Sequence, residues 1–291
     1  MNFFDLHADT PLILDSNNAK SSVIDLRSHP FEEYKQVMAI FLRETEQTPT
    51  SVYNRRLNLL EAYLKNCDFP LLKQGINHPC GALLAVENAG FLVEDIEFIY
   101  RLKDNGVSLL SLTWNSDNLL ASGSNGNDGI TKKGKEVIKL MNELGIALDI
   151  SHLSHKAAME GIWLADKVLA SHSAIFSLNP HNRNIKDEAL IALKQKQGIV
   201  GLCLYPLFLG DENVSEKIIC SVEHLLNLGL ENNIAIGTDF DGAAMAPSMS
   251  KTADIPSLYN AFCNYGFKKS ITEAIFYKNA IAFFGKMCEN K

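Results

Sequence analysis

The sequence has no apolar run of about twenty residues, the length that a helix needs to cross a bilayer. It also has no cluster of Lys or Arg, and its formal net charge is −7. Nucleic acids and anionic membrane surfaces bind proteins through a basic face, so these absences argue against both kinds of partner. No basic segment followed by an apolar stretch precedes Phe3, so we expect a cytoplasmic protein without a secretory signal.

Two common motifs are also absent. None of the cysteines forms a Cys-x-x-Cys pair, which argues against a zinc knuckle or a dithiol redox site, and we expect reduced thiols. No Gly-x-Gly-x-x-Gly follows the first apolar segment, which weakens a dinucleotide-binding interpretation. The six cysteines are Cys67, Cys80, Cys203, Cys220, Cys263 and Cys288.

What the sequence does contain is typical of a globular protein, with 46% hydrophobic and 21% charged residues among 291. Eight short, almost wholly apolar segments read as strands: 3–10, 37–42, 81–86, 107–113, 146–150, 168–170, 199–204 and 234–238. Segments with helical spacing alternate with most of them: 52–65, 91–103, 131–144, 156–166, 187–197, 214–228 and 270–287.

Strands that are apolar throughout are buried on both faces, as in parallel sheets. Eight strand–helix units in a chain of this length favour an α/β fold of the (β/α)8 TIM-barrel type, with residues 1–291 as a single catalytic domain. The first unit is the weakest, because the polar segment 15–33 shows no clear helix. Thr131 should cap one helix and Gly145 should end it. The loop 115–129 is long and rich in Gly, Asn and Ser, as functional loops often are.

Metal-capable side chains recur where the predicted strands end. His7 and Asp9 are two residues apart, so in an extended chain both side chains leave on one face. In a barrel the carboxyl ends of all strands open on the face that holds active sites. Three imidazoles and three carboxylates suit zinc and suffice for two ions that share a bridging carboxylate, which predicts metal-assisted hydrolysis by a bridging hydroxide. The six residues are His7, Asp9, Glu87, His152, His172 and Asp239.

The segments around these residues resemble the motifs of the membrane (renal) dipeptidase family of zinc peptidases, in the amidohydrolase superfamily. They occur in the family's order between residues 3 and 242, and read DLHADT, LLAVENAG, LTWNSDNLLASG, ALDISHLS, ASHS, NPHNRNI and IGTDFDG. The resemblance implies a metal-dependent hydrolase barrel that cleaves dipeptides with a free carboxylate. It also implies a homodimer.

Carried over by position, the resemblance implies that His7 and Asp9 bind one zinc ion, that His152 and His172 bind the other, and that Glu87 bridges both. It makes Asp239 the acid/base that takes a proton from the water and passes it to the leaving amine.

Substrate contacts follow from the same resemblance. Arg183 would grip the substrate carboxylate with its planar guanidinium group, and Tyr205 matches a pocket tyrosine. Trp114 stands where animal members carry a histidine thought to help hold the substrate carbonyl. Bacterial relatives share the tryptophan, so we expect activity, with Trp114 in the substrate pocket or in the core.

The remaining polar residues have smaller expected roles. His155 should begin the next helix, and His181 could line the pocket or lie on the loop surface. Three aspartates next to predicted ligands could orient the imidazoles, although Asp241 could equally be a turn residue. These aspartates are Asp5, Asp149 and Asp241, and the histidines expected to be structural are His29, His78 and His224.

Two alternatives remain open at this stage. The same site could hydrolyse a lactone, a cyclic amide or a dedicated biosynthetic intermediate, in which case Arg183 would not serve a dipeptide carboxylate. A degenerate barrel could instead bind a ligand or a partner without chemistry. The presence of all six metal-capable residues argues against that second alternative.

Overall fold

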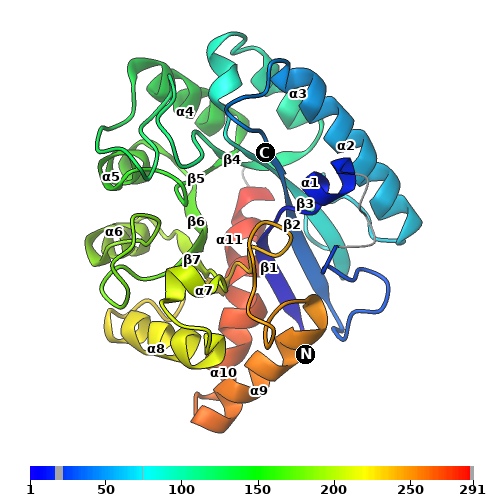
Figure 1. Cartoon of the computed structure of the whole chain (residues 1–291), viewed down its shortest axis with the longest axis vertical. Helices are drawn as coiled ribbons and strands as arrows, with labels where there is room; N and C mark the ends of the chain where they lie inside the picture. The colour runs from blue at the N-terminus through cyan, green and yellow to red at the C-terminus, as the bar shows by residue number, and fades with distance from the viewer. Residues whose placement is uncertain (17–21, 74, 289–291) are drawn as a thin grey trace.

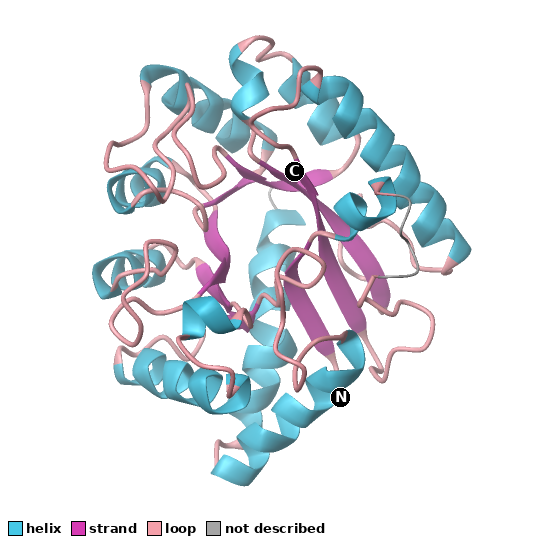
Figure 2. Cartoon of the chain, viewed as in Figure 1, coloured by secondary structure: helices cyan, strands magenta, loops and turns pink. Residues whose placement is uncertain are grey.

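Eight parallel strands form a closed barrel in the order β1 to β8 (Figures 1 and 2). The computed structural model describes residues 1–16, 22–73 and 75–288. Each strand pairs with its neighbour in the chain, and β8 closes the ring through the pairing of Ile236 with Asp5 of β1. The strands are β1 (Phe3–Ala8), β2 (Tyr34–Phe41), β3 (Cys80–Glu87), β4 (Val107–Ser111), β5 (Ala147–Asp149), β6 (Val168–Ser173), β7 (Ile199–Leu202) and β8 (Ile234–Ile236). The predicted TIM-type barrel is confirmed.

Helices surround this ring of strands (Figure 2). The helices between strands are α1 (Thr10–Asp15), α2 (Pro49–Asn66), the 3-10 helix η2 (Gly90–Val93), α3 (Phe98–Asp104), α4 (Lys132–Leu144), α5 (His155–Leu164), α6 (Asp187–Gln195), α7 (Pro206–Leu209) and α8 (Val214–Asn227). After β8 come the 3-10 helix η3 (Thr252–Asp254), α9 (Ile255–Tyr265), α10 (Lys269–Glu273), the π-helical turn η4 (Ala274–Lys278) and α11 (Asn279–Cys288).

Several predicted boundaries need correction. The helix absent from the first predicted unit is α1, a six-residue helix with a proline in its first turn, too short to show helical periodicity. The predicted helix 91–103 is two pieces, η2 and α3. Phe91 and Phe98 are both buried and lie seven residues apart, so helical spacing survives across the turn that separates these pieces.

Strand β2 begins at Tyr34, three residues before the predicted start, and its first polar residues are buried and hydrogen-bonded. The Tyr34 hydroxyl donates to Gln36 Oε1 at 2.6 Å, and Lys35 Nζ donates to the Tyr277 hydroxyl at 2.9 Å. The sequence analysis missed α9 entirely. Helix α4 behaves as predicted, since the Thr131 side chain accepts from Gly134 N and Gly145 ends the helix.

Helix α11 packs against the side chains that point into the barrel, and Figure 1 shows it crossing the ring of strands. The Phe284 ring stacks on Phe4 of β1, with centroids 5.1 Å apart. The hydrogen bond between Lys35 and Tyr277 lies at the start of β2. The amino-terminal end of the barrel is therefore filled by the C-terminal helix, which leaves the carboxyl ends of the strands for the functional site.

Two strand irregularities shape the other end of the barrel. The register of β1 shifts between Asp5 and Ala8, and that of β6 shifts between Ala170 and Ser173. The bulged segment of β6 approaches the backbones of β7 and β8 closely. A Cβ atom at Gly201 or Gly237 would lie 1.9 or 1.8 Å from the Ser171 carbonyl oxygen, so only glycine fits at either position. The two glycines therefore make room for Ser171.

In the part of the chain that the structure describes, no helix is both long enough and apolar enough to span a bilayer.

Candidate metal centre

The six predicted residues converge at the carboxyl end of the barrel, and all six side chains are buried. His7 lies at the end of β1, with its Nε2 atom 3.4 Å from Asp9 Oδ2 and 3.2 Å from Glu87 Oε2. Glu87, the last residue of β3, directs its other oxygen to a different histidine, since Oε1 lies 3.0 Å from His152 Nε2. A single carboxylate therefore stands between two groups of possible ligands.

The second group lies after β5 and on β6. The Nε2 atoms of His152 and His172 are 2.9 Å apart, and the rings of His7 and His172 are 3.8 Å apart between centroids. Three overlapping sets of potential ligand atoms each fall within 4.8 Å of one another: His7, Asp9 and Glu87; Glu87, His152 and His172; and His7, His172 and Asp239. Asp239, which the sequence analysis made the acid/base, is thus also within reach of a metal.

The donor set fits a divalent metal. Three buried atoms of the cluster have no hydrogen-bond partner: His7 Nε2, Asp9 Oδ1 and Glu87 Oε2. Leaving such groups buried and unsatisfied is costly, and a cation among them would satisfy all three. Imidazole nitrogens and carboxylate oxygens are ligands that zinc and similar first-row metals accept.

The pKa shifts within the cluster also favour a bound cation. Burial raises the pKa of Asp239 to about 7, partly offset by His7, while Asp9 and Glu87 raise it further. Burial also raises the pKa of Asp9, with a further contribution from the charge of Glu87. Burial lowers the pKa of His172 well below its usual value. These carboxylates are crowded with one another, which a bound cation would relieve.

Each of the three imidazoles has a polar partner at its other ring nitrogen. His152 Nδ1 lies 2.9 Å from Asn115 Oδ1, and Asn115 belongs to the long loop before α4. The Ser171 hydroxyl lies 2.8 Å from His172 Nδ1 and 3.4 Å from His7 Nδ1. Sequence reasoning missed both partners. Their positions gave a signal, because Asn115 follows Trp114 in a quoted motif and Ser171 directly precedes His172.

The three aspartates expected to orient imidazoles act differently. Asp5 accepts from the backbone of His7 and from Thr238, which joins β1 to the end of β8. Asp241 accepts from Thr10, Ser22 and the backbone of Val23, and so fixes the segment before β2. Neither aspartate is hydrogen-bonded to an imidazole among the described residues, and Asp241, with a φ of 66°, is the turn residue of the alternative interpretation.

Asp149 does act on the histidines, but through an intermediary. Its Oδ2 accepts a 2.5 Å hydrogen bond from the Ser171 hydroxyl, which in turn contacts His172 and His7. The predicted link from this aspartate to the imidazoles is thus indirect.

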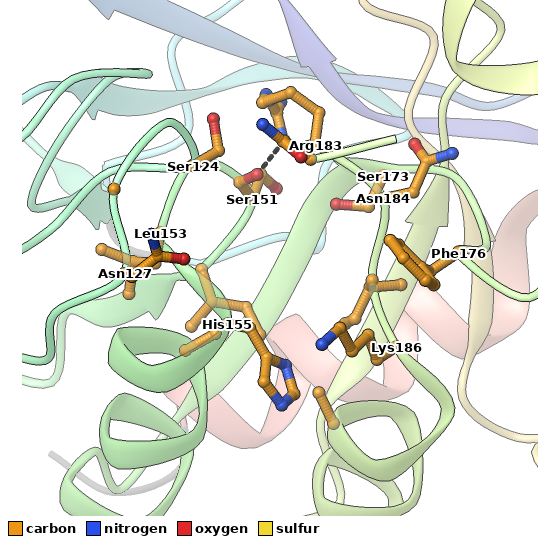
Figure 3. A pocket seen from close by; sticks show the side chains of 16 residues that line it. Ser124, Asn127, Ser151, Leu153, His155, Ser173, Phe176, Arg183, Asn184 and Lys186 are labelled. Carbon is orange, nitrogen blue, oxygen red and sulfur yellow. Dashed lines mark hydrogen bonds between the residues drawn. The ribbon is translucent and has the colours of Figure 1, made fainter. Parts of the chain in front are cut away.

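Arg183 lies beside the second histidine pair. Its Nη2 atom is 3.2 Å from His152 Nε2 and 3.0 Å from His172 Nε2, and its Nη1 donates to the Ser151 carbonyl oxygen (Figure 3). The guanidinium also lies 5.2 Å from the centre of the Phe208 ring. Arg183 and Ser151 also line a cavity of about 240 Å³ between the starts of α5 and α6. Arg183, the residue predicted to bind the substrate carboxylate, therefore lies at the cluster.

The other predicted pocket residues flank the cluster. The Trp114 ring is 37% exposed and lies 6.2 Å from the His152 ring and 5.3 Å from Phe41. Trp114 is therefore partly exposed beside the cluster and is not buried in the core. Tyr205 caps α7 and meets the Phe208 ring edge-on at 4.9 Å.

The remaining histidines lie outside the cluster. His155 begins α5, as predicted, and its Nε2 contacts Glu188 at the start of α6. His181 Nδ1 accepts from the backbone of Arg183 at 3.1 Å, which supports the loop that carries this arginine. The three histidines expected to be structural make contacts away from the cluster: His29 with Phe31, His78 with Cys80, and His224 of α8 with Asp187 of α6.

Comparison with known proteins agrees with this geometry. The chain is 28% identical over 207 residues to an uncharacterized dipeptidase of Schizosaccharomyces pombe, an alignment that covers 68% of this chain and 50% of the yeast protein. The chain thus spans about half the length of that relative.

Two solved structures share the fold over nearly the whole chain. The dipeptidase AC, a metallopeptidase of family M19, has a TM-score of 0.86 at 20% identity, and the alignment covers 98% of this chain and 99% of that one. A metallopeptidase from Rhodobacter sphaeroides, solved with a phosphinate mimic of the dipeptide L-Ala-D-Ala, has a TM-score of 0.83 at 18% identity and covers 99% of both chains.

The family model of the membrane dipeptidases matches residues 68–290, which include Glu87, His152, His172 and Asp239 but not the first strand. This match covers most of the chain. The protein therefore belongs to the membrane dipeptidase family, peptidase family M19.

Proposed function

We propose that this protein is a binuclear zinc dipeptidase that hydrolyses dipeptides with a free C-terminal carboxylate. The observation that carries the proposal is the position of Glu87. Its two oxygens face different histidines, at 3.2 Å from His7 and 3.0 Å from His152. This is the arrangement expected of a carboxylate shared by two ions.

In this proposal His7 and Asp9 hold one ion, and His152 and His172 hold the other. Two zinc ions would supply an activated water and a Lewis acid for the scissile carbonyl. The unpartnered oxygens of Asp9 and Glu87 support these assignments, because each is buried and faces the cluster.

Asp239 is proposed to move the proton. It is a buried carboxylate at the cluster, where it could accept a proton from water and return it to the leaving amine. It lies within the set formed with His7 and His172, close to where the water would sit.

Arg183 is proposed to bind the substrate carboxylate, with Tyr205 and Trp114 forming walls of the pocket. The support is a buried guanidinium whose Nε atom has no hydrogen-bond partner, next to the cluster. A planar guanidinium matches a carboxylate with two parallel hydrogen bonds. The bound dipeptide mimic in the Rhodobacter structure is consistent with this substrate class.

The proposal is tested by assaying simple L,L and L,D dipeptides before and after treatment with a chelator. We expect hydrolysis to disappear on chelation and to return with added zinc. Equal turnover by metal-free protein would contradict the proposal, and turnover of lactones but not dipeptides would move it to the other hydrolytic class.

Three expectations from the sequence remain proposals: that residues 1–291 form one catalytic domain, that the protein is a homodimer, and that it is cytoplasmic. Light scattering on the purified protein tests the dimer.

A further inference from the structure

The Ser171 hydroxyl lies between two candidate ligands that the proposed function assigns to different ions. It is 2.8 Å from His172 Nδ1 and 3.4 Å from His7 Nδ1. It also lies 2.5 Å from Asp149 Oδ2 and 3.2 Å from the Ser151 hydroxyl. Ser171 is completely buried, so these protein groups are what its hydroxyl can bond to.

The position of its single proton follows from this set of neighbours. A carboxylate can only accept, and Asp149 Oδ2 makes the shortest contact, so Ser171 donates there. Ser151 donates its own proton to Asp149 Oδ1 at 2.7 Å and accepts from the backbone of His172. The two lone pairs of Ser171 are then left for the two imidazoles, each of which must present an N–H at Nδ1.

Independent contacts give the same protonation for His172. The Arg183 Nη2 group, which can only donate, lies 3.0 Å from His172 Nε2. His172 Nε2 therefore carries the lone pair and Nδ1 carries the proton. An imidazole in this state presents Nε2 to a metal, the atom that faces the cluster.

We propose that Ser171, held by Asp149, is a positioning residue shared by the two halves of the metal site. Its single hydroxyl fixes the ring of one ligand on each side, His7 for one ion and His172 for the other. His152 is positioned separately by Asn115.

The backbone geometry around Ser171 supports this positioning role. Bulges in β1 and β6 fall beside His7 and Ser171, and Gly201 and Gly237 leave room for the Ser171 carbonyl. Asp149 holds the backbone of the same segment, because its Oδ1 accepts from the N–H groups of Ser151 and Ser171 at 3.0 Å. Ser171 reaches across the barrel to His7 because of these irregularities.

The test is Ser171→Ala, compared with Asn115→Ala and with Ser221→Ala. Ser221 is an equally buried serine whose hydroxyl bonds the Lys217 carbonyl within α8, away from the metal centre. The readout is nuclear magnetic resonance of protein labelled with 15N-histidine, with His7→Gln and His172→Gln used to assign the ring signals.

In zinc-loaded protein we expect Ser171→Ala to speed exchange of the Nδ1 protons of both His7 and His172 and to leave His152 unchanged. Asn115→Ala should speed exchange at His152 and leave His7 and His172 unchanged. Ser221→Ala should alter none of the three. Zinc affinity should fall about 10- to 100-fold in Ser171→Ala, the usual effect of removing a partner of a metal-bound imidazole. Unchanged exchange at His7 would overturn the shared role.

The inference rests on the proposed metal site, but its failure can be told apart from that of the proposed function. In metal-free protein, the Nδ1 proton of His172 should exchange slowly in wild type and faster in Ser171→Ala, because Arg183 fixes the tautomer but only Ser171 accepts from Nδ1. That result is independent of zinc. Equal exchange rates in the two proteins would overturn the role of Ser171 even if the enzyme proved to be a zinc dipeptidase.

Discussion

The Nε2 atoms of His152 and His172 lie 2.9 Å apart, although His152 follows β5 and His172 lies on β6. Two lone pairs repel at this distance unless a proton or a cation lies near both. Arg183 supplies that positive charge here, with Nη2 at 3.2 and 3.0 Å from the two nitrogens. A zinc ion held by the pair would supply this charge instead and would leave the guanidinium of Arg183 free to bind a substrate carboxylate, as proposed above.

Metal removal should lower stability as well as activity. Ligand that binds only the folded state stabilises it by about 2.7 kcal/mol at a hundred times its dissociation constant. We therefore expect the melting temperature to fall on chelation and to recover with zinc, measured by scanning calorimetry. An unchanged melting temperature across a zinc titration would show that the cluster binds no metal.

Asp9→Ala should abolish turnover while the barrel stays folded. Asp9 lies after β1, and its side chain makes no capping hydrogen bond to α1, so we expect the fold to survive its loss. We expect turnover to fall by about 100-fold or more, since losing only an outer partner of a ligand costs about 10- to 100-fold. Circular dichroism checks folding, and Asp104→Ala, at an exposed aspartate of α3, is the matched control. Retained activity would mean that the metal centre has been assigned to the wrong residues.

Arg183→Ala should weaken binding of dipeptides that carry a free carboxylate. Hydrogen bonds to charged groups contribute about 1.5–3 kcal/mol, so we expect kcat/KM to fall by about 10- to 150-fold. The corresponding dipeptide amides, which lack the charge, should lose far less. Arg101→Ala, at an exposed arginine of α3, provides the control. Equal losses on acids and amides would remove Arg183 from carboxylate recognition.

Asp239 should make the stability of metal-free protein depend on pH. Its pKa is about 7 in the folded protein against 3.8 for the free side chain, because it is buried. The folded state therefore binds the extra proton between these values, and this contribution to stability is lost as pH rises from about 4 to 7. The slope is at most about 1.4 kcal/mol per pH unit. Urea unfolding should show this loss in wild type and not in Asp239→Asn, and parallel curves for the two proteins would contradict it.

The sequence was sufficient to predict the barrel and the convergence of the six residues, because both follow from the order of apolar strands. Glu87 and Asp239 each come at the carboxyl end of a predicted strand, and a parallel barrel brings these ends together on one face. The partners of the imidazoles did not follow. Ser171 reaches His7 only because β1 and β6 both bulge, and such shifts break the simple alternation of sides.

Other elements were missed for local reasons. Helix α1 is too short for periodicity. Tyr34 and Lys35 look unlike an interior strand, because their polar atoms are paired in the fold by Gln36 and by the distant Tyr277. Asn115 was hidden in a loop of similar polar residues, and only the fold brings it to His152.

The most direct test is a crystal structure of the zinc-loaded protein with anomalous diffraction at the zinc edge. We expect two peaks at the carboxyl end of the barrel, about 3.5–4 Å apart. One peak should lie beside His7 and Asp9 and the other beside His152 and His172, with Glu87 between them. A single peak, or none among these residues, would contradict the binuclear site.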